Sequence, residues 1–331
     1  MRLALLVGFV TGVAACSAVT DPFTPPLAPS ERYADALREA GLDSTRLGRA
    51  WTGAADGAVR QAAASDLPAQ DEVPVEAGTP AAASWRVDLR RGEVLRVTVA
   101  PSLADSATVF LDLFAGDSTA VRLGGWAASV DTLRVERRAE RDEAVVVRLV
   151  AELLAEGSVS VGVETAPSLA FPVAGVGEGA IGSRWGAPRD GGARSHEGVD
   201  VFAERGTPVV AAAAGRVTRV QETPIGGLVV WLRPDDAAVS LYYAHLDRQL
   251  VEDGARVAAG DTLGEVGTTG NAAGTPPHLH FGVYGRGGAV DPEPFLVGRR
   301  RPPRTADASE RAEAPRTGRS VRGAGTARGG G

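Results

Sequence analysis

The sequence predicts a mainly β protein, in which a C-terminal antiparallel β-sheet domain follows a small β-sandwich and a short helical segment. Three observations support this fold class. Apolar and polar residues alternate in short runs between residues 83 and 166. From residue 171 onward, short β segments alternate with Gly-rich turns. Residues 31–64 instead carry good helix formers. The length of 331 residues suits about two domains.

Composition excludes several classes of function. The formal charge of −6 argues against a nucleic-acid partner, because phosphate contacts need clustered positive charge. Every residue in the Lys+Arg count of 35 is Arg, so lysine chemistry such as a Schiff base or lipoyl attachment is absent. One cysteine cannot form an internal disulfide.

The N-terminus has the layout of an export signal. Arg2 precedes a short apolar region, residues 3–13, which is too short to span a bilayer. Val13-Ala14-Ala15-Cys16 resembles the lipobox of bacterial lipoproteins. This resemblance implies a signal peptide over residues 1–15, acylation of Cys16 and anchoring in a membrane of the cell envelope, with the protein on the periplasmic face. The absence of Asp at position 17 favours the outer membrane, and a plain signal peptide is the alternative.

Residues 16–82 are expected to form a tether, a helical spacer and a linker. A Pro-rich stretch covers residues 21–29, and Ser30 is a candidate N-cap for a helix over residues 31–40. A second helix is expected over residues 44–64. Residues 65–82 are rich in Pro, Ala and Glu, which is typical of a linker.

The β-sandwich is expected over residues 83–166, with Arg91-Gly92 in a tight turn. We expect a structural or wall-binding role for it, because it carries no evident catalytic constellation. Its predicted strands are residues 85–89, 94–99, 109–114, 132–135, 144–149 and 159–163.

The C-terminal domain is expected over residues 171–298, followed by a disordered tail over residues 299–331, which lack apolar periodicity. Two halves of a β-hammerhead are recognisable in residues 209–217 and 254–261. A biotinyl or lipoyl carrier of that fold needs an acceptor Lys, which the chain lacks. The predicted strands are residues 209–213, 216–220, 228–232, 239–243, 263–266 and 280–284.

All four histidines lie in this domain, within spaced motifs. In a strand, His196 and Asp200 share a face, and an imidazole and a carboxylate are both good zinc ligands. The sequence does not fit the His-Glu-x-x-His helix of zincins, because Asp replaces the second His and Gly198 is a poor helix former.

The other two motifs rest on the same alternation. His278 and His280 flank Leu279 and share a face of a strand, so both imidazoles can reach one site. Tyr243 and His245 are expected to share a face as well. Each histidine alone is more often a surface or core residue, so the argument depends on their combination.

In this order, His-x-x-x-Asp, Tyr-x-His-Leu and Gly-x-Thr-Gly-Asn…Pro-His-Leu-His-Phe resemble the lysostaphin/LytM-type peptidoglycan endopeptidases, over about residues 172–297. The resemblance implies a LytM-like β-sheet metallopeptidase domain that cuts peptide cross-links of bacterial peptidoglycan. It implies one zinc ion bound by His196, Asp200 and His280, with a groove above it flanked by residues 267–274. His245 and His278 would be the catalytic pair, in roles that stay open.

One position departs from the family pattern. Some members carry a Tyr shortly before the first zinc ligand, and residues 186–195 contain none. Arg194 or Tyr243 is a candidate replacement. The alternative function is a catalytically silent relative that activates another wall hydrolase, but such proteins typically lack zinc ligands or catalytic histidines, and this chain keeps all five positions. The sequence identifies no protein partner.

Overall fold

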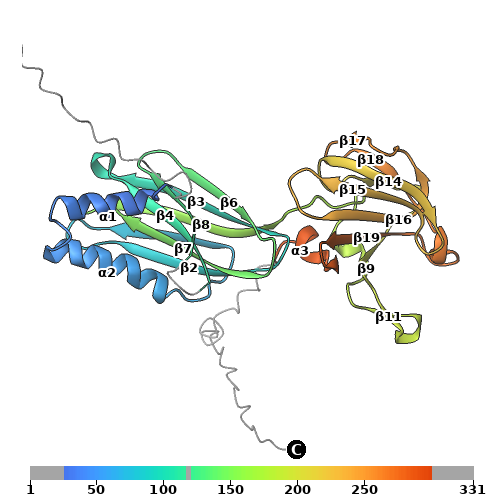
Figure 1. The fold of residues 1–331 in the computed structure, drawn as a ribbon, viewed down its shortest axis with the longest axis horizontal. Helices are drawn as coiled ribbons and strands as arrows, with labels where there is room; N and C mark the ends of the chain where they lie inside the picture. Colours follow the sequence, from blue (N-terminus) through green and yellow to red (C-terminus); the bar gives the residue numbers. More distant parts are fainter. Residues whose placement is uncertain (1–25, 117–120, 300–331) are drawn as a thin grey trace, which may run out of the picture.

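Two β lobes lie side by side in the computed structural model, which describes residues 26–116 and 121–299 (Figure 1). Strands form most of both lobes and pair antiparallel in each sheet, which confirms the prediction of a mainly β, antiparallel fold. The predicted signal peptide, the predicted lipidation site Cys16 and the tail beyond Arg299 lie outside the described residues. Across the described ranges, no helix has the length and apolarity needed to cross a membrane.

The first lobe is a sandwich of two four-stranded sheets. Apolar side chains such as Leu95, Leu111 and Val147 fill the space between the sheets and are fully buried. One sheet has the order β1 (Ala69–Val75), β8 (Gly157–Pro167), β3 (Glu93–Leu103), β6 (Leu133–Arg138). The other has the order β2 (Ala82–Leu89), β7 (Glu143–Ala151), β4 (Val109–Ala115), β5 (Arg122–Ala128).

The structure corrects the expected linker over residues 65–82. Strand β1 occupies its middle and pairs with β8 over seven residues, so this segment belongs to the sandwich. Most side chains of this edge strand are polar and face solvent, so its composition resembles that of a linker. Strand β5 was also not predicted. The turn at Gly92 connects β2 to β3, which lie in different sheets.

Helices α1 (Pro29–Glu39) and α2 (Arg46–Arg60) cover the outer face of the β2-β7-β4-β5 sheet (Figure 1). Trp51 is buried between α2 and this sheet, and its Nε1 donates to the carbonyl oxygen of Ala151 at 2.8 Å. The helices are therefore part of the first lobe, and the expected helical spacer is wrong. Their apolar faces made this packing possible, since an amphipathic helix gains most of its stability from burial.

The sequence predicts Ser30 as the N-cap of α1, but the structure places Ala28 at that position. The side chain of Glu31 accepts from the backbone N–H of Ala28 at 2.8 Å and closes the helix start instead. Ser30 is buried, and its hydroxyl donates to Asp112 of β4 at 2.9 Å. Asp112 also pairs with Arg148 at 2.6 Å and with Arg122. This network ties the helix to the sheet.

The second lobe contains a large antiparallel sheet around one apolar core. Its central strands are β16 (Ser240–Gln249), β19 (His278–Gly285) and β12 (Val199–Phe202). The full order is β17 (Arg256–Val257), β14 (Gly215–Thr223), β15 (Gly227–Pro234), β16, β19, β12, β9 (Ile181–Ser183). Off this path are β13 (Pro208–Val210), β18 (Thr262–Val266), β20 (Gly288–Val290) and the separate hairpin β10 (Pro188–Arg189) and β11 (Arg194–Ser195).

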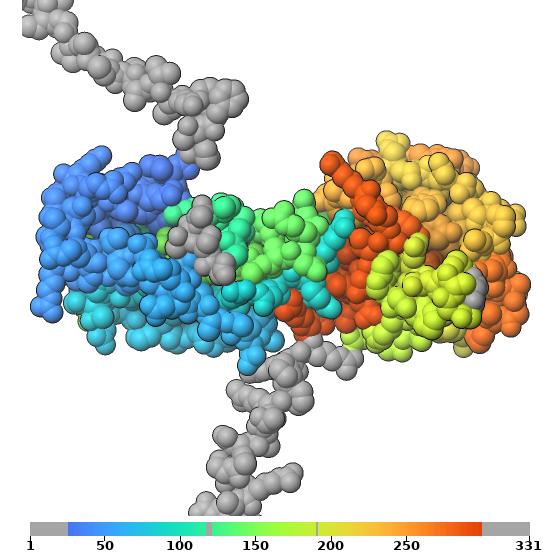
Figure 2. Space-filling model, turned by 60° about the horizontal axis from the view of Figure 1, so that its bottom comes forward, coloured from blue at the N-terminus to red at the C-terminus, as the bar shows by residue number. Residues whose placement is uncertain are grey.

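A narrow waist joins the lobes, and residues near the end of the described chain fill it (Figure 2). Phe295 of α3 (Glu293–Leu296) lies so close to Gly92 that a Cβ there would stand 2.4 Å from its ring. Glu93 is 1% exposed and accepts from Arg299 at 2.6 Å, although Arg299 was expected to begin the tail. These contacts hold the two lobes together.

Replacing Asp112 with Ala is expected to destabilise the first lobe by about 3–5 kcal/mol. The change leaves the buried guanidinium of Arg148 without its counter-ion, and an unpaired buried charge is far more costly than a lost surface pair. Urea unfolding followed by the fluorescence of the buried tryptophans measures the loss. Asp35→Ala is the matched control, because its pair with Arg38 is exposed. Equal effects of the two changes would contradict the structural role of the network.

Candidate active site

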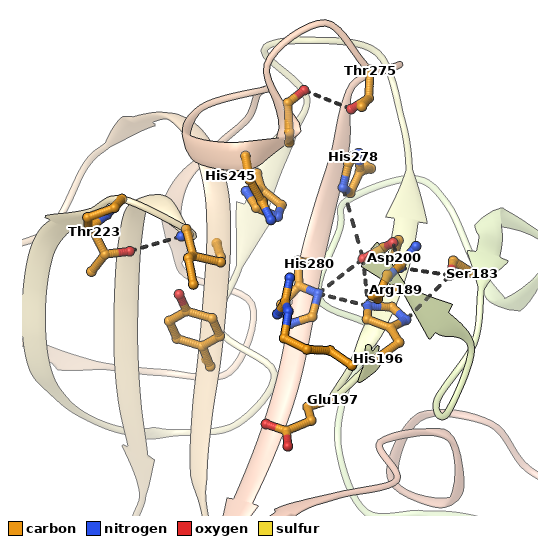
Figure 3. Close-up of a pocket in the computed structure, with 18 of the residues that line it drawn as sticks. Ser183, Arg189, His196, Glu197, Asp200, Thr223, His245, Thr275, His278 and His280 are labelled. Atoms are coloured by element: carbon orange, nitrogen blue, oxygen red, sulfur yellow. Dashed lines mark hydrogen bonds and ion pairs between the residues drawn. The ribbon is translucent and has the colours of Figure 1, made fainter. Parts of the chain in front are cut away.

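Three side chains with metal-ligating atoms meet at the surface of the large sheet. Asp200 of β12 lies directly opposite His280 of β19 in the antiparallel register. His196 precedes β12, which begins only at Val199, so the expected strand from His196 to Asp200 is wrong in its first half. The chain bends at Gly198 and still brings His196 to the same side as Asp200 (Figure 3).

The ligand atoms of these three residues converge within 4.8 Å of one another. His196 Nε2 and His280 Nδ1 lie 3.0 Å apart, and Asp200 Oδ1 lies 3.0 and 3.1 Å from them. His196 Nδ1 lies 3.0 Å from the carbonyl oxygen of Arg184. A carbonyl only accepts, so Nδ1 carries the proton and the lone pair on Nε2 faces the site. This donor set fits one zinc ion with an open coordination position.

Gly198 is required by this arrangement. A Cβ at Gly198 would lie 2.6 Å from Cε1 of His280 and 2.7 Å from the carbonyl oxygen of Phe281. Real side chains do not approach so closely, so any other residue would push the His196 segment away from β19. The glycine in the first sequence motif therefore serves the close approach of the two ligand-bearing segments.

Asp200 is held in its ionised form. Burial alone would disfavour the charge, but the adjacent imidazoles of His196 and His280 outweigh it and hold the pKa of Asp200 well below its usual range. Its second oxygen, Oδ2, pairs with the guanidinium of Arg189, which also donates to Ser183 at 2.9 Å. Arg189 therefore leaves Oδ1 as the oxygen that faces the two imidazoles.

A second pair of imidazoles lies beside this cluster. The rings of His245 and His278 are 5.1 Å apart, and both side chains are buried. His245 Nδ1 lies 2.9 Å from the carbonyl oxygen of Thr269, and His278 Nδ1 lies 2.9 Å from that of Pro276. By the same argument both carry the proton on Nδ1 and present Nε2 as an acceptor. Burial, followed by the neighbouring imidazoles, lowers the pKa of His245 to about 4, so it is neutral near pH 7.

His245 reaches this position through an unusual backbone conformation. Its φ is 63°, and the pairing of β15 with β16 shifts register beside it. Regular alternation would place Tyr243 and His245 on one face, which is the sequence expectation. The structure contradicts it: Tyr243 is fully buried, and its hydroxyl accepts from the N–H of Ala212 at 2.9 Å. Tyr243 is therefore a core residue and does not replace the missing family tyrosine.

A groove of about 940 Å³ lies over the four histidines and Asp200. The expected glycine-rich loop supplies Asn271 and Ala272 to its wall, and the hairpin β10–β11 supplies Arg189 and Arg194. Arg189 lacked any signal in the sequence, because only the folded hairpin brings it to Asp200. The floor of the groove also includes three aromatic residues that no sequence motif indicated: Trp231, Tyr242 and Tyr284.

Comparison with known proteins places the site within a family model. Residues 194–292 match the model of peptidase family M23, and this matched segment contains all four histidines and Asp200. The segment is 38% identical over 94 residues to the peptidoglycan DD-endopeptidase ShyC of Vibrio cholerae, covering 28% of this chain and 21% of the relative. It is 36% identical over 126 residues to an L-Ala–D-Glu endopeptidase of Bacillus subtilis, covering 34% and 38%.

Two further similarities concern a lipoprotein and a solved structure. The uncharacterized lipoprotein YgeR of Escherichia coli is 38% identical over 109 residues, covering 32% of this chain and 40% of that protein. The catalytic domain of lysostaphin from Staphylococcus simulans is 35% identical, covering 35% of this chain and 90% of that domain, with a TM-score of 0.32. The chain thus spans two fifths or less of the length of these curated relatives. Its C-terminal lobe belongs to the LytM-type peptidases of family M23.

Proposed function

We propose that this protein is a zinc-dependent endopeptidase that hydrolyses peptide cross-links of bacterial peptidoglycan. The observation that carries the proposal is the convergence of two imidazole lone pairs and one carboxylate oxygen beside a second imidazole pair, all within one groove. The names of the related endopeptidases support the substrate class. Because these relatives cut different bonds, the proposal does not specify which peptide bond is cleaved.

His196, Asp200 and His280 would hold the ion through Nε2, Oδ1 and Nδ1. When bound, zinc supplies Lewis-acid polarisation of the scissile carbonyl and lowers the pKa of a bound water to near 7. Arg189 keeps the carboxylate of Asp200 from rotating, because it holds Oδ2 on the side away from the imidazoles.

His245 and His278 are proposed to move protons. Both present an unprotonated Nε2, so either can accept a proton from the attacking water and return it to the leaving amine. The ring that has taken the proton carries an Nε2–H, which can donate a hydrogen bond to the oxyanion of the tetrahedral intermediate before the proton passes to the leaving amine. Their roles stay open, because both rings have the same tautomer and face the same groove.

Location follows from the N-terminal features predicted in the sequence. We infer export by the signal over residues 1–15 and anchoring through lipidated Cys16, with the peptidase in the bacterial envelope and the outer membrane favoured. The similarity to a lipoprotein supports this inference. A membrane anchor would keep the enzyme next to an insoluble substrate.

Loss of one ligand is expected to abolish cleavage. His280→Ala removes Nδ1 from the donor set and should lower the rate of cross-link cleavage by at least about 100-fold, since catalysis needs the bound ion. Purified protein is incubated with zinc and peptidoglycan, and released muropeptides are identified by mass spectrometry. A chelator should inactivate the unmodified protein, and added zinc should restore it. Glu252→Ala, an exposed change outside the groove, is the control.

The outcomes separate the enzyme from a silent activator. Cleavage by the unmodified protein alone supports the enzyme and identifies the bond. A folded protein that neither cuts nor binds zinc in a titration would overturn the proposal and favour activation of another wall hydrolase.

Arg189 is expected to support metal binding indirectly, because it holds the carboxylate of the proposed ligand Asp200 through Oδ2. Arg189→Met keeps the alkyl stem but removes the group that holds Oδ2, and loss of such outer partners typically costs about 10- to 100-fold in metal affinity. Removing the positive charge of Arg189 has the opposite effect on its own, because it lowers the electrostatic repulsion of the metal cation and so raises metal affinity. We expect orientation to dominate, because Asp200 is only 6% exposed and water has little access to replace the guanidinium.

Competition with a chromophoric chelator measures the zinc Kd of this variant. Arg248→Met is the matched control, because Arg248 pairs with Glu265 at the surface. An unchanged or tighter Kd for Arg189→Met would show that the guanidinium does not position Asp200.

A further inference from the structure

An aromatic shelf continues the groove floor beyond the metal site. Trp231 of β15, Tyr242 of β16 and Tyr284 of β19 form it. The ring centroids of Trp231 lie 4.5 Å from Tyr242 and 5.1 Å from Tyr284, and those of the two tyrosines lie 6.1 Å apart. All three rings are half-buried, so part of each reaches the groove. Adjacent strands therefore place one continuous aromatic surface there.

The shelf begins directly beside a proposed metal ligand. The ring of Tyr242 lies 5.9 Å from that of His280 in an edge-on arrangement. Tyr242 pairs across the strands with Gly282, and a Cβ at Gly282 would stand 2.8 Å from the ring of Tyr284. The glycine therefore makes room for Tyr284 to lie next to Tyr242. A substrate residue on the shelf would be close to the bond positioned over the metal site.

A carboxylate borders the same surface. Glu197 is exposed, lines the groove and points away from His245 and His278 (Figure 3). Glu197 lines the same groove as the shelf, and its backbone carbonyl oxygen would lie 3.4 Å from a Cβ at Gly282, the residue opposite Tyr242. After burial, the charge of Glu197 is the next cause that raises the pKa of Tyr284 to about 12. Among the described residues, no Arg or His forms an ion pair with Glu197. Its negative charge therefore remains available to a ligand.

We propose that Trp231, Tyr242, Tyr284 and Glu197 form a subsite for a free ammonium group of the peptide substrate. This inference rests on the proposed function and adds a substrate feature to it. Aromatic faces attract cations, and the attraction adds to that of a nearby carboxylate. A substrate carboxylate would be repelled by Glu197, and an uncharged group would gain nothing from its charge. The subsite therefore favours a peptide that carries a primary amine beside the scissile bond.

Chemical acetylation of peptidoglycan tests the subsite, because it neutralises free amines and leaves peptide bonds intact. Initial rates are compared on native and N-acetylated peptidoglycan for the zinc-loaded protein, Glu197→Gln and the control Glu252→Gln. Acetylation should lower the rate of the unmodified protein and of the control by roughly 3- to 10-fold, as expected for one exposed cation site. Glu197→Gln should show a similar loss on native substrate and little further loss after acetylation.

Two tyrosine variants separate ring contact from packing. Tyr284→Leu removes the aromatic face and should lose most of the preference for native substrate, whereas Tyr284→Phe keeps the face and should retain it. Thermal unfolding confirms that each variant is folded. The proposal is overturned if acetylation leaves the unmodified protein unaffected, or if Glu197→Gln slows cleavage of both substrates equally.

A binding measurement keeps this inference separate from the peptidase activity. Retention of the zinc-loaded protein on insoluble native and acetylated peptidoglycan is measured by sedimentation, without reliance on cleavage. The subsite is supported if the unmodified protein is retained less on acetylated than on native material, and if Glu197→Gln is retained equally on both. This result would support the subsite even if no bond is cut. Equal retention on both materials, in a protein that cleaves peptidoglycan, overturns the subsite and leaves the proposed function intact.

Discussion

Backbone carbonyl groups set the chemistry of this site, because a carbonyl oxygen can only accept a hydrogen bond. Those of Arg184, Thr269 and Pro276 each accept from the Nδ1–H of a histidine and so turn the Nε2 lone pair of that ring inward. The main chain thus fixes both tautomer and ring orientation before any ligand arrives. The site depends on where three loops place their peptide groups, as much as on the side chains themselves.

The large sheet supplies the second constraint, which is register. Asp200, His280 and Ala244 lie opposite one another on three neighbouring strands, and the aromatic shelf follows from pairings further along the same strands. A shift by one residue in β19 would turn both of its histidines into the core. Metal site and shelf are therefore consequences of a single alignment, and glycines at two positions allow the chains and rings to approach.

Local patterns in the sequence predicted what depends on local geometry. His278 and His280 are two residues apart in a strand, so alternation alone places both on one face. The two main β regions were also recognisable from short alternating runs and Gly-rich turns, and both helical stretches from their good helix formers. The position of the helices on the sandwich was not, because it depends on Trp51 meeting a strand a hundred residues away. Arg189 escaped notice for the same reason, since its partner Asp200 meets it only after the hairpin folds back.

The left-handed backbone at His245 sets stability and activity against each other at one position. A side chain at φ 63° costs about 1–2 kcal/mol relative to glycine, even though histidine adopts this conformation more readily than most residues. Selection of variants for heat resistance alone would therefore tend to enrich Gly at position 245. Such proteins would melt later and lack one of the two imidazoles in the groove. Thermal screening of this domain therefore needs an activity filter, because the strain at this position belongs to the site and not to a defect in the fold.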